Sequence, residues 1–118
     1  MKTILLVEDD SSVRALLRAT LEDPTYRILE AHSGEEALRI ARSESVDLAV
    51  LDWMLPGISG LDVLHAFTKS RPLFPAIILT GRTRDQDMKL AFSHSARHYL
   101  KKPFNPVEVS RRVEALLS

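Results

Sequence analysis

The sequence predicts an α/β fold of five βα units, in which a parallel sheet lies between two layers of helices. Short aliphatic runs alternate along the whole chain with segments of helical periodicity. Such alternation favours a parallel sheet whose right-handed crossovers place helices on both faces. The length of 118 residues suits one domain with its own core. We expect that domain to span residues 1–118.

The five predicted strands are short and rich in aliphatic residues, as buried strands are. The first lies in MKTILLVEDD, whose apolar core is too short for a signal peptide, so we interpret it as a strand. The predicted strands are TILLV (3–7), YRILEA (26–31), DLAVL (47–51), PAIILT (75–80) and HYLKK (98–102).

The segments between the strands carry apolar residues at three- and four-residue spacing, which is typical of one helix face. Ser33 with Glu36, and Asn105 with Glu108, have the spacing of a helix-capping box. Pro106 suits a first helical residue. The predicted faces are Val13, Leu16, Leu17 and Leu21; Ala37, Leu38 and Ala41; Leu61, Leu64 and Phe67; Met88, Ala91 and Phe92; and Val109, Val113, Leu116 and Leu117.

The composition excludes several classes of protein. Cysteine is absent, which excludes disulfide scaffolds, cysteine-ligated zinc and thiol chemistry, and fits a reducing, cytoplasmic location. Sixteen basic residues balance sixteen acidic ones, so we expect no direct binding to nucleic acid or to an anionic membrane. No apolar stretch approaches the roughly 20 residues that span a bilayer.

Polar residues follow four of the predicted strands. Ligand sites of open α/β sheets lie at the carboxyl ends of the strands, so these side chains are expected to share one edge. They are Glu8, Asp9 and Asp10 after the first strand, Asp52 after the third, Thr80 at the end of the fourth and Lys102 at the end of the fifth.

Crowded carboxylates repel one another unless a cation joins them. Oxygen ligands suit a hard cation, and Mg²⁺ takes one or two carboxylates together with phosphate oxygens. We therefore expect Asp10 and Asp52 to bind Mg²⁺ directly and Asp9 to bind it through water. Glu8 begins the turn, and we expect its side chain to point away.

The remaining polar groups suit phosphoryl transfer. An ammonium group such as that of Lys102 pairs with an anionic oxygen, and the hydroxyl of Thr80 can donate to another. An aspartate beside a metal, a cation and a hydroxyl donor is suited to act as a carboxylate nucleophile, so we predict Asp52 in that role. Trp53 follows it, and we expect this indole to be partly exposed near the site.

Four motifs, in this order and spacing, resemble those of the response-regulator receiver domain of two-component signalling, including the chemotaxis regulators. They are ILLVEDD (4–10), LDWMLPGISG (51–60), ILTG (78–81) and YLKKPF (99–104). The resemblance covers the chain end to end. It implies a doubly wound, flavodoxin-like (βα)5 fold with strand order 2-1-3-4-5, and a phosphoacceptor rather than a conventional enzyme.

The resemblance also implies roles for single residues. Phosphoryl would pass to Asp52 from a sensor histidine kinase or a histidine phosphotransfer protein in a Mg²⁺-dependent reaction, and the signal would reach an unknown downstream protein or an attached output domain. The implied metal ligands are Asp9, Asp10, Asp52 and the backbone carbonyl of Met54; Lys102 and Thr80 would contact the phosphoryl group, and Thr80 and Tyr99 would form the switch.

The segment KKPFNPVEVSRRVEALL resembles receivers of winged-helix transcription factors, which typically dimerise through the fourth helix, fifth strand and fifth helix. Glu108 and Arg112 match part of the charge pattern on that face. Arg97 and His98, however, stand where acids are usual, and Met88 stands where a base is usual. We expect this chain to stay monomeric or to dimerise by another surface, with this face binding a different protein.

Three alternative functions require residues that differ from those of this chain. A receiver-like interaction module that is never phosphorylated would usually lack one of the acids, Thr80 or Lys102, and all are present. A flavin-binding electron carrier needs a Ser/Thr/Gly-rich loop where EDDSS stands. An aspartyl phosphatase needs a second aspartate two residues after Asp52, and Met54 stands there.

Overall fold

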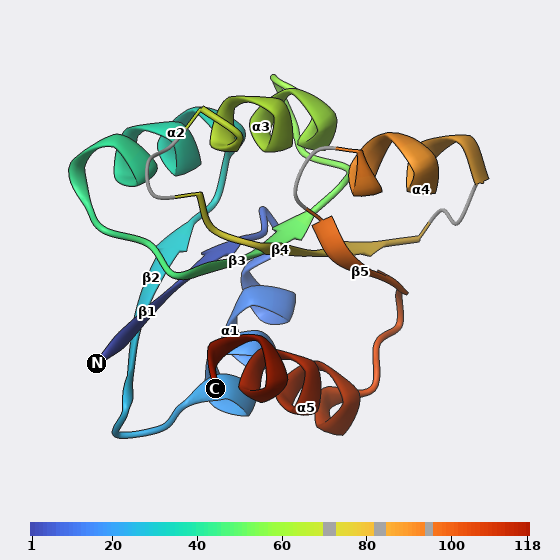
Figure 1. The fold of residues 1–118 in the computed structure, drawn as a ribbon. Coiled ribbons are helices and arrows are strands. Elements are labelled where there is room, and N and C mark those ends of the chain that lie inside the picture. The colour runs from blue at the N-terminus through green and yellow to red at the C-terminus, as the bar shows by residue number, and fades with distance from the viewer. Residues whose placement is uncertain (70–72, 82–84, 94–95) are drawn as a thin grey trace.

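A parallel sheet of five strands forms the centre of the molecule (Figure 1). The computed structural model describes residues 1–69, 73–81, 85–93 and 96–118. Its sheet order is β2-β1-β3-β4-β5, and every neighbouring pair is parallel. The elements are β1 (Lys2–Val7), α1 (Ser11–Leu21), β2 (Tyr26–Ala31), α2 (Gly34–Ser43), β3 (Leu48–Asp52), α3 (Gly60–Phe67), β4 (Ala76–Thr80), α4 (Asp85–Phe92), β5 (Ala96–Lys101) and α5 (Pro106–Leu117).

The helices form two layers, with α1 and α5 on one face of the sheet and α2, α3 and α4 on the other (Figure 1). Alternate residues of β3 serve the two layers: Leu48 and Val50 pack toward α1 and α5, whereas Ala49 and Leu51 pack toward α2 and α3. Every residue of β3 is buried, as the continuous apolar run predicts. The predicted fold and strand order are thus confirmed.

Strand bounds differ from the predicted ones where the ladder extends past the apolar run. Asp52 is the last residue of β3 rather than the residue after it, because it pairs with Leu79 of β4. Strand β5 begins at Ala96, two residues earlier than predicted, because Ala96 pairs with Ala76. It ends at Lys101, so Lys102 is the first residue beyond the strand.

Most residues of the predicted helix faces are buried or partly buried, but two are not. The side chains of Leu16 and Phe92 are 48% and 47% exposed. Helix α1 packs through Leu17 and Leu21, four residues apart, and Leu16 lies outside this narrower stripe. Phe92 ends α4, where its ring meets Tyr99 instead of the core. In the described part of the chain, no helix is long and apolar enough to cross a membrane.

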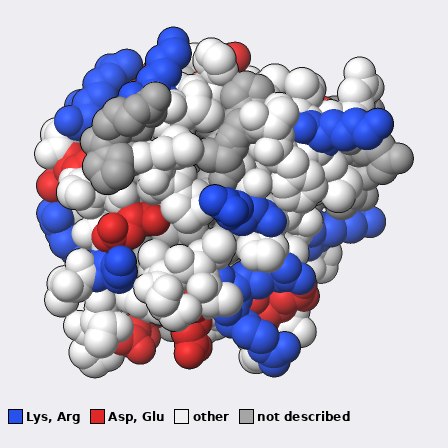
Figure 2. All heavy atoms as spheres, viewed as in Figure 1, with Lys and Arg blue, Asp and Glu red and all other residues white. Residues whose placement is uncertain are grey.

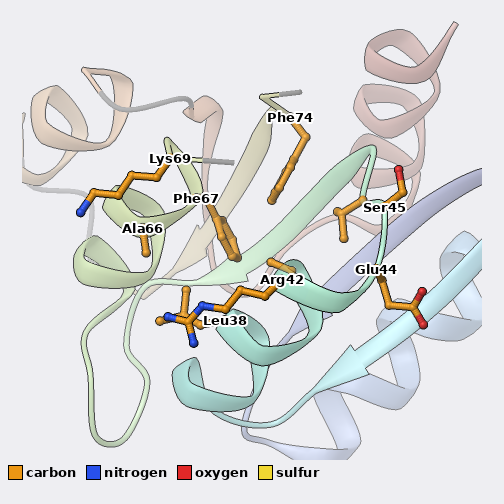
Figure 3. Close-up of a pocket in the computed structure, with 10 residues that line it drawn as sticks. Leu38, Arg42, Glu44, Ser45, Ala66, Phe67, Lys69 and Phe74 are labelled. Carbon is orange, nitrogen blue, oxygen red and sulfur yellow. The ribbon is translucent and has the colours of Figure 1, made fainter. Parts of the chain in front are cut away.

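A groove of about 540 Å³ lies between the ends of α2 and α3 (Figure 3). Phe67 and Phe74 form part of its lining, with their ring centroids 5.0 Å apart. Val46 and Phe74 precede β3 and β4, so the groove lies at the amino ends of these strands. It is therefore separate from the strand edge where the sequence places the polar residues.

Candidate functional site

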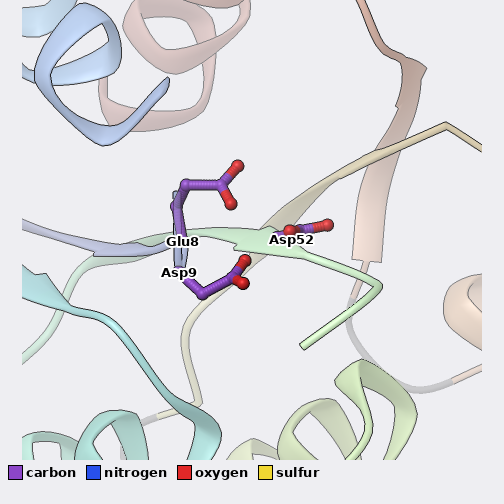
Figure 4. A group of neighbouring side chains, drawn as sticks. All are labelled: Glu8, Asp9 and Asp52. Carbon is purple, nitrogen blue, oxygen red and sulfur yellow. The ribbon is translucent and has the colours of Figure 1, made fainter. Parts of the chain in front are cut away.

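Three acids meet at the carboxyl edge of the sheet (Figure 4). Glu8, Asp9 and Asp52 each offer one carboxylate oxygen, and these oxygens all lie within 4.8 Å of one another. Glu8 and Asp9 follow β1, while Asp52 ends β3, the strand beside it. Glu8 and Asp52 are only 1% and 5% exposed, whereas Asp9 is exposed. We call these three residues the acidic group.

Hydrogen bonds to backbone groups fix the two buried acids, Glu8 and Asp52. The amide of Glu8 donates to the carbonyl of Ala31 at 3.0 Å, which extends the β1–β2 ladder by one residue. The carbonyl of Glu8 accepts from Nη1 of Arg14 at 2.8 Å. On the β3 side, Oδ1 of Asp52 accepts the amide of Met54 at 3.0 Å. The backbone of Glu8 is therefore fixed by two hydrogen bonds, and the carboxylate of Asp52 is oriented by the Met54 amide.

Lys102 lies between the two buried acids. Its Nζ atom is 2.5 Å from Oε1 of Glu8 and 3.3 Å from Oδ2 of Asp52. Its amide donates to the carbonyl of Thr80 at 2.7 Å, and the Lys102–Pro103 peptide bond is cis. The lysine predicted to contact the phosphoryl group is thus fixed at the end of β5, within ion-pair distance of the predicted nucleophile.

Two pKa shifts describe the charge balance of the site. Burial raises the pKa of Glu8, and the nearby Asp52 raises it further, although the hydrogen bond from Lys102 opposes both. For Lys102, burial lowers the pKa, but the hydrogen bond to Glu8 and the charge of Asp52 outweigh burial, so its pKa is raised. The raised pKa of Lys102 therefore reflects the two carboxylates beside it, whereas that of Glu8 reflects mainly its burial.

Asp10 lies outside the acidic group and caps α1. Its Oδ1 accepts the amides of Ser12 and Val13 at 2.9 and 3.2 Å and the hydroxyl of Ser12 at 2.6 Å. These bonds, the Ser12 hydroxyl first, lower the pKa of Asp10. Glu8, rather than Asp10, joins Asp9 and Asp52, so the expectation that the Glu8 side chain points away is wrong.

The sequence itself contains a signal that assigns Asp10 to the helix and Glu8 to the acidic group. Asp10 stands directly before Ser11-Ser12 and the first helical turn, which is the ordinary place for a capping aspartate. If Asp10 is given to the helix, the two acids left to face β3 are Glu8 and Asp9. The apolar run that ends at Val7 supports the same choice, because the ladder continues into Glu8.

The predicted switch residues lie on β4 and β5 beside this site. Thr80 ends β4 and is fully buried. Tyr99 lies on β5 opposite Ile78, and its ring is 6.1 Å from that of Trp53 and 6.5 Å from that of Phe92. Trp53 is only 6% exposed, so the expected partial exposure is wrong, because the indole belongs to the hydrophobic core and packs against Tyr99.

The donor chemistry of the acidic group fits a hard divalent cation. All three residues present carboxylate oxygens, the ligands that Mg²⁺ prefers. With the acids ionised, Lys102 offsets one negative charge and leaves two. Met54, whose backbone carbonyl the resemblance implies as a further ligand, stands two residues after Asp52 with its side chain half exposed.

This fold and site define a flavodoxin-like domain with a cation-binding acidic edge. The family model described as the response regulator receiver domain matches residues 4–114. The chain belongs to that family, and it is a phosphoacceptor domain rather than a conventional enzyme. It is therefore a component of two-component signalling, as the four sequence motifs imply.

Curated relatives support the same membership. The chain is 40% identical over 116 residues to the response regulator GtcR of Aneurinibacillus migulanus and to the alkaline phosphatase synthesis transcriptional regulatory protein PhoP of Bacillus subtilis. These matches cover 98% of this chain and 48% of each relative. It is 39% identical to the transcriptional regulatory protein CpxR of Escherichia coli, over 99% of this chain and 50% of that protein. The chain thus spans about half the length of these relatives.

Solved structures share the fold closely. A CheY-like receiver domain from Methanospirillum hungatei has a TM-score of 0.91 at 29% identity and covers 98% of this chain and 94% of that one. The response regulator TrrA of Thermotoga maritima, solved in complex with Mg²⁺ and BeF, has a TM-score of 0.86 at 36% identity. That match covers 98% of this chain and 99% of TrrA.

Proposed function

We propose that this chain accepts a phosphoryl group on Asp52. The observation that carries the proposal is a buried carboxylate at the carboxyl end of β3, 3.3 Å from the ammonium group of Lys102 and beside two further acids. A carboxylate in that setting is a nucleophile whose reaction depends on positioning and on neutralisation of charge. We assign residues 1–118 to this receiver domain.

The metal is Mg²⁺, held by carboxylate oxygens of Glu8, Asp9 and Asp52 and by the backbone carbonyl of Met54. The composition of the acidic group supports this set, as does the Mg²⁺ in the TrrA complex. Asp10 is not part of the set, because its carboxylate is occupied at the start of α1. When bound, the ion supplies positive charge that offsets the acids and the phosphoryl oxygens.

The reaction follows from the residues of the chain. A carboxylate oxygen of Asp52 attacks the phosphorus of a phosphohistidine; the new P–O bond forms as the P–N bond breaks, and the leaving imidazole nitrogen takes up a proton. Lys102 then exchanges its contact with the Asp52 carboxylate for a phosphoryl oxygen. The Thr80 hydroxyl donates to another, and the ring of Tyr99 moves toward the space behind Thr80.

The donor is the phosphohistidine of a sensor histidine kinase or of a histidine phosphotransfer protein. The recipient of the signal is a downstream protein or an attached output domain, since GtcR, PhoP and CpxR are about twice as long as the matched region and the last two are described as transcriptional regulators. We place the protein in the cytoplasm. This domain itself contacts neither nucleic acid nor membrane, in keeping with its balanced charge.

The test is intact-mass analysis after incubation with acetyl phosphate and Mg²⁺. Wild type should gain one phosphoryl group, Asp52→Asn should gain none, and the control Asp62→Asn, an exposed aspartate of α3, should behave as wild type. Chelation of Mg²⁺ should abolish the gain. A folded wild-type protein that stays unlabelled would favour the alternative, a phosphorylation-independent interaction module. Stoichiometric labelling of Asp52→Asn would place the phosphoacceptor elsewhere.

A further inference from the structure

The loop that follows Asp52 is closed at its base. The amide of Gly60 donates to the carbonyl of Trp53 at 3.1 Å. A Cβ atom on Gly60 would lie 2.7 Å from the Trp53 backbone, so only glycine allows this close approach. Inside the loop, the amide of Met54 binds Oδ1 of Asp52 at 3.0 Å. The shape of loop 53–60 therefore bears directly on the orientation of the Asp52 carboxylate.

The outer side of this loop rests on the first turn of α2. Oε1 of Glu35 accepts the amide of Ile58 at 3.2 Å. Gly57 has φ +77°, and a Cβ atom there would lie 2.9 Å from Oε1 of Glu35, so the carboxylate covers this turn. Glycine at position 34 allows α2 to lie this close to the loop, because a Cβ atom there would lie 2.5 Å from Cγ1 of Ile58. Helix α2 thus contacts the loop through backbone and side-chain atoms.

We propose that Glu35 is a positioning residue for the phosphoacceptor site. Glu35 binds the far side of the loop at Ile58, whereas Met54 on the near side of the loop binds Asp52. The inference rests on the proposed function, because the consequence of positioning is measured as Mg²⁺ binding. Its physical basis is the hydrogen bond that the Ile58 amide donates to Oε1 of Glu35, which fixes Ile58 and limits how far the loop can open.

A purely structural role for Glu35 predicts a different behaviour. An acid in the first turn of α2 favours the helix dipole, so its removal could lower the stability of the helix without affecting the loop. Glu35→Gln separates the two roles. The amide oxygen of Gln can still accept the Ile58 amide, whereas the charge that favours the dipole is lost. Rescue by Gln therefore identifies the hydrogen bond as the cause.

The experiment compares wild type, Glu35→Ala, Glu35→Gln and the control Arg39→Ala, which removes an exposed side chain from the same helix. Mg²⁺ binding is measured by calorimetry and by Trp53 fluorescence, and amide exchange of Met54 and Ile58 by NMR. We expect Glu35→Ala to weaken Mg²⁺ binding about fivefold and to increase the amide exchange rates of Met54 and Ile58 by a similar factor. For Glu35→Gln and Arg39→Ala, the Mg²⁺ affinity and the exchange rates should stay within about twofold of wild type.

Equal Mg²⁺ affinity and equal amide exchange in wild type and Glu35→Ala would overturn the inference. So would equal losses in Glu35→Ala and Glu35→Gln, since charge rather than the hydrogen bond would then be the cause. A wild type that binds no Mg²⁺ would contradict the proposed function instead. In that case the exchange rates of Met54 and Ile58 still decide whether Glu35 holds the loop.

Discussion

The ammonium group of Lys102 lies 3.3 Å from the carboxylate of Asp52 and also pairs with Glu8. One cation thus pairs with two buried acids at the carboxyl ends of different strands: Glu8 directly after β1 and Asp52 as the last residue of β3. Truncating one partner of such a cluster leaves like charges facing one another without compensation. The same ammonium competes for the acids with any metal that binds them. Lys102 therefore links the stability of the fold to occupancy of the site.

Lys102→Gln should lower the free energy of unfolding by about 2 kcal/mol in metal-free buffer, because Glu8 and Asp52 lose their shared cation. Mg²⁺ should restore part of the loss and should bind the variant more tightly than wild type. Urea unfolding with and without Mg²⁺ measures both effects. The exposed neighbour Lys101 provides the control variant Lys101→Gln. Equal behaviour of the two variants would contradict the shared ion pair.

The acidic group leads to a second prediction that separates two adjacent aspartates. Asp9→Asn should weaken Mg²⁺ binding at least about tenfold, because it removes a charged oxygen ligand. Asp10→Asn should change binding less than about twofold, since asparagine caps helices as well as aspartate does. Asp10→Ala should instead lower the free energy of unfolding by about 1 kcal/mol.

Calorimetric titration of Mg²⁺ and urea unfolding of the same samples distinguish these outcomes. The sequence pattern predicts the opposite order, with Asp10 as a direct ligand. Strong loss of Mg²⁺ binding in Asp10→Asn, with Asp9→Asn unaffected, would restore that assignment.

The sequence predicted those parts of the molecule that depend on periodicity. Strand β3 was predictable because burial on both faces requires an unbroken apolar run, and every residue from Leu48 to Leu51 supplies it. Two of the three grouped acids, Asp9 and Asp52, were predictable, because parallel strands place their carboxyl ends at one edge of the sheet. Glu8 joins the site because its amide extends the strand ladder to Ala31, whereas Asp10 caps α1. Both interactions depend on which segments pair in three dimensions.

The position of Trp53 shows a second limit of the sequence. A residue directly after a strand can point outward or turn back over the sheet, and residue type alone does not decide between them. Here its amide donates to the carbonyl of Leu79 at 3.0 Å, which keeps the backbone in line with β3. The indole then lies on the same face as Leu51 and meets Tyr99 of β5.

The switch prediction concerns Thr80 and Tyr99. Thr80→Ala should still accept phosphoryl on Asp52, because the nucleophile, the acids and Lys102 are intact. It should lose much of the structural response, because the phosphoryl group no longer has the hydroxyl contact that favours the active arrangement. The NMR signals of Tyr99 and the fluorescence of Trp53, whose rings are 6.1 Å apart, report that response. Equal changes in wild type and Thr80→Ala would refute the coupling.

His98 gives the fold a pH dependence below neutrality. Burial lowers the pKa of His98, and the Arg112 guanidinium, 2.7 Å from Nδ1, lowers it further against the opposing charge of Glu108. The unfolded chain, with its ordinary pKa of about 6.5, therefore takes up the proton first as the pH falls. The contribution of His98 to stability is fully present above that pKa and is lost as the pH drops toward the folded-state value.

His98→Asn keeps an oxygen that can accept from Arg112 but cannot titrate. Relative to this variant, wild type should lose stability between about pH 7 and pH 5, as measured by urea unfolding at several pH values. A constant difference in the free energy of unfolding over this range would show that His98 titrates alike in both states.

The face formed by β5 and α5 leads to the final prediction. Figure 2 shows Lys and Arg side chains gathered on the side where these elements lie. Arg97, Lys101 and Arg111 are exposed there, while Arg112 is already bound to Glu108 and His98 of its own chain. A symmetric dimer through this face would bring these cations together, and like charges in contact disfavour such an assembly.

We therefore expect the chain to remain monomeric in light scattering with beryllofluoride and Mg²⁺, which stand in for the aspartyl phosphate. Arg97→Glu should make self-association more favourable, because an acid at position 97 can pair with Arg111 of a second copy. The control Arg39→Ala changes an exposed cation on α2, away from this face, and should have no effect. A stable wild-type dimer that Arg97→Glu disrupts would show that this surface assembles through Arg97 itself.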